Sequence, residues 1–302
     1  MKRFISLTAA AWISSASIIC IPVQAQETNP LFSQERVRNF LPHMTWPEVE
    51  EVLTRTDVAL IPVGAIEQHG RHLPLGTDSY AATELCKLVA QRADALVVPV
   101  VLTGLSAHHL GFPGSLTISA ATFEQVIFET AEALIHHGIR KIVLYNGHGG
   151  NTASVANVIT RINNSTAATA VDLGLIEVPA GDSPYGSADF DWHAGVGETS
   201  WMLFLTPQLV QMDAAENPVL TFPPDAQEAR ETMSGGNLDM LLSAYLWRPD
   251  VTGKKAASHQ ITSNGVFTMG DVNTASAAQG RFRFEHLVEA AAQFINEWNG
   301  KR

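Results

Sequence analysis

Short apolar runs alternate with longer stretches of helical periodicity along most of the chain. The strand-like runs cover residues 58–63, 96–102, 141–145 and 170–178. Between them, apolar residues recur every three or four positions, which predicts helices over residues 77–92, 122–137 and 151–162. Repeated strand–helix units predict a parallel sheet with helices on both faces. The expected fold class is therefore α/β, a single-domain three-layer α/β/α arrangement with a mostly parallel central sheet.

Helix-capping residues and the spacing of apolar residues predict the remaining elements. Residues 45–48 (TWPE) form a capping box with proline in the first turn, so a helix starts there and runs to about Arg55. Residues 198–205 have the pattern of a buried helix, and an amphipathic helix over 283–298 ends the chain. The least regular part, 218–262, is interpreted as an insertion over the site mouth and, through its apolar segment 238–247, as a subunit interface.

The first 25 residues have the three parts of a secretory signal peptide. Lys2 and Arg3 give a positive start, residues 4–22 are apolar, and Val23-Gln24-Ala25 is a small-residue cleavage signal. The expected mature domain is therefore 26–302, and the expected location is periplasmic or secreted. The alternative is an uncleaved leader that serves as a membrane anchor. No other stretch approaches the ~18 uninterrupted apolar residues that a spanning helix needs.

Composition narrows the range of partners. The net charge is −11, and it becomes −13 after cleavage, because the leader holds two basic residues and no acidic ones. An acidic surface disfavours nucleic acid and anionic membranes as partners, and it leaves a small-molecule substrate open. Cleavage also removes Cys20, so the mature chain keeps only Cys86 and cannot form an intramolecular disulfide.

Residues that suit metal ions follow two of the predicted strands. After the first strand come Glu67, His69 and Asp78, and the strand at 141–145 runs into the sequence NGHGGN, which contains His148. Carboxylates and imidazoles are ligands that Zn, Mn and Fe accept. Because ligands gather at the carboxyl ends of parallel strands, we expect a metal site there.

With VGAIEQHGRHLPLGTD followed by NGHGGN, the sequence resembles the creatininase family of metal-dependent amidohydrolases. Further segments that fit are GFPGSL at 111–116, HAGVGETS at 193–200 and the glycine-containing stretch 265–280. The resemblance spans about 58–280, nearly the whole mature chain. It implies a creatininase-like fold, one or two divalent transition metal ions per subunit (Zn, Mn or Fe), and a homo-oligomer, with a hexamer favoured.

The resemblance also assigns roles by position. Glu67 and His148 correspond to ligands of one ion, His69 to a ligand of the other, and Asp78 to a bridging carboxylate. His193 matches the residue near the leaving nitrogen, so it is expected to act as general acid or base.

One position departs from the creatinine-hydrolysing members. They carry an acidic ligand two residues after the NGH histidine, where this chain has Gly150. Glu198 is the expected substitute, either as a metal ligand or as a catalytic proton-transfer group. The alternative is that Glu198 only favours a helix N-terminus and that the second ion is weak or absent. His72, His108 and Trp192 are weaker candidates for substrate contacts, as is His109 beside His108.

The resemblance and these residues together predict a secreted or periplasmic metal-dependent hydrolase. It would cleave a C–N bond of a small amide (a cyclic amide, a formamide or a peptide-like bond) by means of metal-activated hydroxide. Gly150 disfavours creatinine itself as substrate. The alternatives are a lactone or ester hydrolase that uses the same site, and a catalytically inactive small-molecule binding protein of the same fold.

Overall fold

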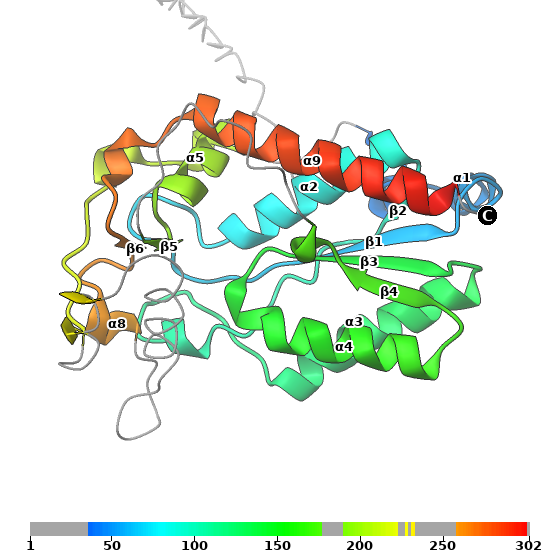
Figure 1. The fold of residues 1–302 in the computed structure, drawn as a ribbon, viewed down its shortest axis with the longest axis horizontal. Coiled ribbons are helices and arrows are strands. Elements are labelled where there is room, and N and C mark those ends of the chain that lie inside the picture. Colours follow the sequence, from blue (N-terminus) through cyan, green and yellow to red (C-terminus); the bar gives the residue numbers. More distant parts are fainter. Residues whose placement is uncertain (1–35, 177–189, 223–226, 229–230, 233–257, 301–302) are drawn as a thin grey trace, which may run out of the picture.

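The computed structural model describes residues 36–176, 190–222, 227–228, 231–232 and 258–300. Its centre is a four-stranded parallel sheet with the order β2-β1-β3-β4 (Figure 1). The strands are β1 (Val58–Val63), β2 (Leu96–Val97), β3 (Lys141–Asn146) and β4 (Thr169–Asp172). Every residue of β1 is buried, as its continuous apolar run predicted, because this strand has neighbours on both edges and helices on both faces.

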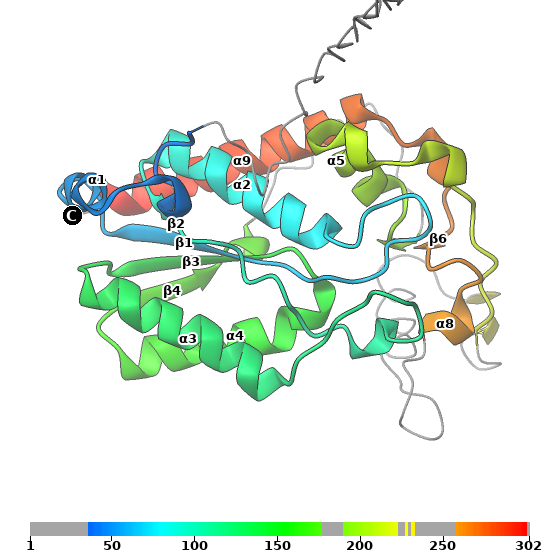
Figure 2. The same cartoon turned by 180° about the vertical axis from the view of Figure 1, so that it is seen from behind.

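Helices cover both faces of the sheet. Figures 1 and 2 show α2 (Thr77–Ala93) and α9 (Ala277–Asn299) on one face, with α3 (Ala120–His136) and α4 (Thr152–Ser165) on the other. Each face has its own apolar core. Leu85, Phe284 and Ile295 belong to the first core, and Phe123 and Ile162 belong to the second. The predicted three-layer α/β/α fold is confirmed.

The order of the strands changes direction beside β1. The chain passes from β1 through α2 to β2 on one side, and later through α3 to β3 on the other side. In sheets of this kind, ligands bind beyond the carboxyl ends of the strands at the point of reversal. The expected place for a site is therefore beyond the ends of β1 and β3.

Several smaller elements surround that place. Strand β5 (Asp191–His193) pairs antiparallel with β6 (Phe267–Thr268), and α5 (Val196–Leu205) follows β5 directly. The short helix α8 (Ser258–Ile261) lies at the same end of the molecule, opposite the end that carries α1 (Trp46–Leu53) (Figure 1). The predicted capping box at the start of α1 is present.

Two strands are shorter than the sequence predicted. The run 96–102 forms strand only at β2, because Pro99 has no N–H to donate to the sheet. In the described part of the run 170–178, which ends at 176, the chain leaves the sheet after Asp172, whose carboxylate accepts a hydrogen bond from the Gly174 N–H and starts a 3₁₀ turn.

The last helix is longer than predicted. It starts at Ala277 rather than at 283, because the Ser276 side chain caps it by accepting a hydrogen bond from the Gln279 N–H. The extra turns place Gly280 against the backbone of α5, where a Cβ atom would overlap the Ser200 carbonyl.

Gly280→Ala is expected to destabilise the fold. A Cβ at this position would also lie 2.9 Å from the Trp201 nitrogen, so helices α5 and α9 would have to separate. Overpacking of this kind costs about 1–3 kcal/mol, although alanine normally favours a helix over glycine by roughly 0.5–1 kcal/mol. Thermal unfolding should show a lower Tm. Gly149→Ala is the control, since its Cβ would meet no described atom within 4 Å, and an equal Tm for both variants would contradict the close helix contact.

Parts of the sequence prediction lie outside the described residues. They include the signal peptide at 1–25, the end of the predicted strand 170–178, and most of the predicted insertion 218–262 with its interface segment 238–247. The domain limits 26–302 therefore stay a prediction. Among the residues that the structure describes, no helix is long and apolar enough to cross a membrane.

Candidate metal centre

Close backbone packing brings the ends of β1 and β3 to the start of α2. A Cβ on Gly64 would lie 2.6 Å from the backbone of the first turn of α2, and a Cβ on Gly147 would lie 2.5 Å from the Asp78 carbonyl oxygen. Only glycine permits these approaches without displacing backbone. Asp78 therefore lies between the loop that carries Glu67 and His69 and the loop that follows β3.

The asparagines of the NGHGGN segment hold the second loop in place. The side chain of Asn146 bonds to both the backbone N–H (3.2 Å) and the carbonyl (2.7 Å) of His148. Asn151 is fully buried; it donates to the Gly64 carbonyl at 3.0 Å and accepts from the Leu105 N–H at 2.9 Å. The position of His148 is thus fixed relative to the loop after β1.

Asp78 lies between two imidazoles. Its Oδ1 is 3.1 Å from Nε2 of His69, and its Oδ2 is 3.3 Å from Nδ1 of His148. The same His148 nitrogen is 3.2 Å from Oε1 of Glu67. One oxygen of Asp78 thus faces each imidazole, so this carboxylate would offer a ligand atom to an ion held on either side.

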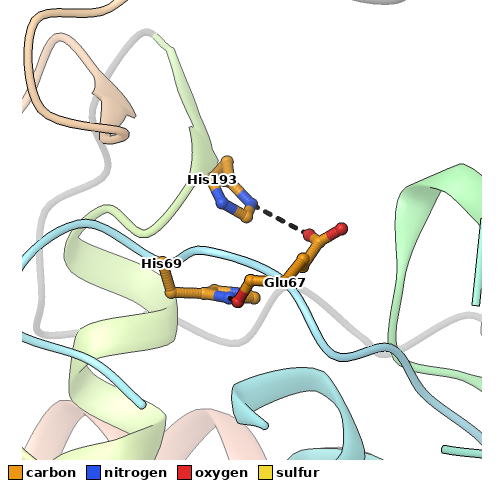
Figure 3. Close-up of side chains that lie close together, drawn as sticks. All are labelled: Glu67, His69 and His193. Atoms are coloured by element: carbon orange, nitrogen blue, oxygen red, sulfur yellow. Dashed lines mark hydrogen bonds and ion pairs between the residues drawn. The ribbon is translucent and has the colours of Figure 1, made fainter. Parts of the chain in front are cut away.

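The carboxylates have few hydrogen-bond donors of their own. Both oxygens of Glu67 and Oδ2 of Asp78 are buried without a hydrogen bond among the described residues. Around Oε1 of Glu67, Nδ1 of His193 and Nε2 of His109 each lie 3.6 Å away, and Figure 3 shows His193 directed at this carboxylate. Burying carboxylate charge without compensation is costly. A divalent cation would satisfy it, so the donor set fits a metal ion.

The possible ligand atoms form three overlapping sets, and within each set they all lie within 4.8 Å of one another. The sets are Glu67, His108 and His148; His69, Asp78 and Glu198; and Glu67, His69 and His193. All five residues predicted as ligands are therefore brought together. The first set adds His108, which the sequence suggested only as a substrate contact. The second set places Glu198, the residue that the sequence offered as a substitute for the carboxylate missing at Gly150, beside His69.

The electrostatics of the site favour positive charge. Burial by itself would lower the pKa of His69, but the facing carboxylates of Asp78 and Glu198 outweigh it and raise the pKa to about 10. The pKa of His148 is likewise raised well above its usual value, against the effect of burial, by Glu67 and Asp78. Burial raises the pKa of Glu198 to about 7. The carboxylates attract cationic charge to this point, and a divalent ion supplies that charge without a proton.

Glu198 lies in the first turn of α5, where the alternative interpretation placed it, but it also faces the site. Its Oε2 accepts a hydrogen bond from the Ala194 N–H at 2.6 Å and lies 3.7 Å from Nε2 of His69. The N-terminus of α5 has another acidic partner, because Asp191 accepts hydrogen bonds from two N–H groups of its first turn at 2.8 and 2.9 Å. The position of Glu198 is therefore compatible with a role in the metal site as well as with stabilising the N-terminus of α5.

The side chains enclose a cavity of about 50 Å³, which is room for ions and water rather than for a whole substrate. Trp192, Gly149 and Gly150 also line it. His108 and Trp192 lie where the sequence predicted. The structure does not bring His72 to this cavity, because His72 is buried and bonds to the Thr199 hydroxyl at 2.9 Å.

Two residues of the site, Gln68 and His109, were not among the main candidates predicted from the sequence. Gln68 contacts both His109 and His193, and His109 faces Glu67. The only sequence signal for Gln68 is its place between two ligand-type residues. His109 had one signal, its neighbour His108 in a short polar segment.

The profile of the creatininase family, described as creatinine amidohydrolase, matches residues 42–295. The chain belongs to the creatininase family. It is 33% identical over 205 residues to creatinine amidohydrolase of Pseudomonas putida, which covers 61% of this chain and 79% of that protein. It is 31% identical over 251 residues to a mycofactocin precursor peptide peptidase of Mycolicibacterium smegmatis, with 81% and 87% covered.

Solved creatininase structures share the fold. A manganese form of creatininase superimposes with a TM-score of 0.65 at 28% identity and covers 86% of this chain and 98% of that one. A point mutant of creatininase described as Zn-Zn type also gives 0.65 at 28% identity, with 85% and 97% covered. These creatininase relatives are hydrolases of C–N bonds by name, and their solved structures include manganese and zinc forms.

Proposed function

We propose that this creatininase-family protein is a metal-dependent hydrolase that cleaves the C–N bond of a small amide. The observation that carries the proposal is the pair of buried carboxylates, Glu67 and Asp78, whose oxygens face ring nitrogens at 3.1–3.6 Å. A bound divalent ion would polarise the amide carbonyl and lower the pKa of a bound water to about 7. The manganese and zinc forms of related creatininases support Zn or Mn, and the mixed N/O donors also suit Fe.

The proposed ligand sets follow the donor geometry. Glu67 and His148 would hold one ion, His69 and Glu198 the other, and Asp78 would lie between them. In this arrangement Glu198 takes the place of the carboxylate that creatinine-hydrolysing members have at the position of Gly150.

His193 is proposed to transfer the proton. Its Nε2 lies 2.6 Å from the Gln68 carbonyl oxygen, which can only accept, so Nε2 carries the hydrogen and Nδ1 presents its lone pair to the site. Burial lowers the pKa of His193 well below its usual value, so the ring starts neutral. Nδ1 can then accept a proton and return it to the leaving nitrogen.

The mouth of the site supports a substrate with a small reacting group. Gly149 and Gly150 line the cavity and have no side chains to narrow it, and Trp192 adds an aromatic surface to its lining. Cyclic amides, formamides and peptide-like bonds all fit this description, whereas Gly150 disfavours creatinine itself. A lactone or ester would use the same residues and is the second candidate. An inactive binding protein is the third, and the complete donor set disfavours it.

Removing the metal is expected to abolish turnover. The purified full chain is assayed against N-formyl compounds, cyclic amides, short peptides and lactones before and after chelation. Loss of the ion should lower turnover by about a thousandfold or more, since metal polarisation is worth several kcal/mol. Zn or Mn should restore it, whereas Ca, which prefers all-oxygen sites, should not. Unchanged turnover in metal-free protein would contradict metal dependence, and bound metal without any turnover would favour the binding protein.

We also propose that the protein is secreted or periplasmic and forms a homo-oligomer. The signal-peptide pattern at 1–25 supports the first statement. The apolar segment 238–247 and the family resemblance support the second.

A further inference from the structure

Gln68 stands between two proposed ligands in the chain, and its carboxamide is buried with one possible orientation. Oε1 accepts a hydrogen bond from the Gly70 N–H at 3.0 Å, and Nε2 donates to the Gly265 carbonyl at 2.9 Å. One partner can only donate and the other can only accept, so exchanging the oxygen and nitrogen would lose both bonds. This orientation requires glycine at position 265, because the residue has a φ of +91° and a Cβ there would overlap Oε1 of Gln68.

Two imidazoles face the remaining Nε2 hydrogen of Gln68. Nδ1 of His109 and Nε2 of His193 each lie 3.0 Å from this nitrogen. Nε2 of His193 already carries a hydrogen, because it donates to the main-chain carbonyl of Gln68 at 2.6 Å. The hydrogen of Gln68 therefore goes to Nδ1 of His109, which must present a lone pair.

The two rings consequently direct opposite groups at one carboxylate. A neutral imidazole has one N–H and one lone pair, and Nε2 of His109 and Nδ1 of His193 are both 3.6 Å from Oε1 of Glu67. We propose that Gln68 is a positioning residue that makes His109 the hydrogen-bond donor and His193 the acceptor at this point. The lone pair on Nδ1 of His193 can then bind a metal ion or accept a proton. The Nε2–H of His109 can donate a hydrogen bond to an oxygen of Glu67 or of the substrate.

Ser258 offers the competing arrangement. Its Oγ lies 3.1 Å from Nδ1 of His109, but its hydroxyl hydrogen is donated to the His108 carbonyl. Ser258 could therefore only accept from His109. That would set an N–H of His109 against the N–H of Gln68 and leave a buried Gln68 hydrogen without an acceptor, which is unfavourable.

The tautomers can be read directly in the metal-free full chain. Long-range ¹H–¹⁵N spectra of ¹⁵N-histidine-labelled protein distinguish protonated from unprotonated ring nitrogens, and His109→Gln and His193→Gln assign the signals. Wild type should show Nε2–H on both rings. In Gln68→Glu the new carboxylate can only accept a hydrogen bond. The ring proton of His109 should therefore move from Nε2 to Nδ1, the nitrogen that faces residue 68. His193 should keep Nε2–H, because a main-chain carbonyl holds it, and so it reports that the fold is intact.

Two further variants keep the result decisive. Gln68→Met has a similar volume and no hydrogen bonds, so Ser258 becomes the acceptor and His109 should again change to Nδ1–H. Ser258→Ala should leave His109 as Nε2–H. Nδ1–H on His109 in wild type, or an unchanged His109 in both Gln68 variants, would overturn the proposal.

A kinetic consequence rests on the proposed function. If the N–H of His109 stabilises an oxyanion, Gln68→Glu should lower kcat by about a hundredfold to a thousandfold with unchanged metal content. Full kcat with a switched His109 would overturn this catalytic role. Absence of turnover in wild type would instead contradict the proposed function, and the spectra would still decide the tautomers.

Discussion

Asp78→Ala is expected to lose most of the bound metal and to lower turnover by about a thousandfold or more. The reason is that Asp78 directs one oxygen to the His69 side and the other to the His148 side, at 3.1 and 3.3 Å, so in the proposed arrangement its loss would remove a ligand from both ions. Elemental analysis of the purified variant and assays on the best substrate measure the two effects.

Asp172→Ala is the matched control for this variant. The Asp172 carboxylate also has a defined structural partner, because it caps the 3₁₀ turn after β4, but it is not among the possible metal donors of the site. It should keep its metal and its turnover. Full metal content in Asp78→Ala would contradict the assignment of Asp78 as a bridge.

Glu198→Gln is expected to lower turnover by about a hundredfold or more and to lower the metal content, because Glu198 would hold the second of the two proposed ions. The change nearly preserves volume and the hydrogen bond from the Ala194 N–H, but it removes the charge that faces His69 at 3.7 Å. If Glu198 only favoured the helix terminus, the cost would be about 0.3–1 kcal/mol of stability with turnover nearly intact. Metal content and kcat therefore separate the two interpretations.

Glu48→Gln provides the comparison. Glu48 lies in the first turn of α1, forms a capping box with Thr45 and has no place among the metal donors. It should lower stability slightly and leave turnover unchanged. A Glu198 variant that behaves in the same way would mean that the site has one well-held ion.

Much of the fold was predictable because it depends on local patterns. The fully buried strand β1 and the capping box of α1 follow from a continuous apolar run and a four-residue signal. Where a boundary was wrong, a single side chain was responsible, such as Asp172 at the end of β4 and Ser276 at the start of α9. Such side chains compete with the surrounding pattern, and the pattern alone does not show which one prevails.

The part of the site that follows the strand ends was predictable from residue type and sheet topology. Glu67, His69 and His148 follow two neighbouring strands, and parallel topology brings such ends to one edge. The position of His193 relative to Gln68 was not predictable, because 125 residues separate them and the contact depends on the pairing of β5 with β6. His72 has the same residue type and lies only three positions from His69, but its ring bonds to Thr199.

The donors also come from segments that are far apart in the chain. Glu67 precedes α2 and Asp78 lies in its first turn, His148 follows β3, and Glu198 lies in the first turn of α5. An ion held by these residues would act as a cross-link that closes long loops without a disulfide. By mass action, an ion present at a hundred times its Kd would add about 2.7 kcal/mol to the free energy of unfolding. The apparent stability of this protein would then report how much free metal its surroundings contain.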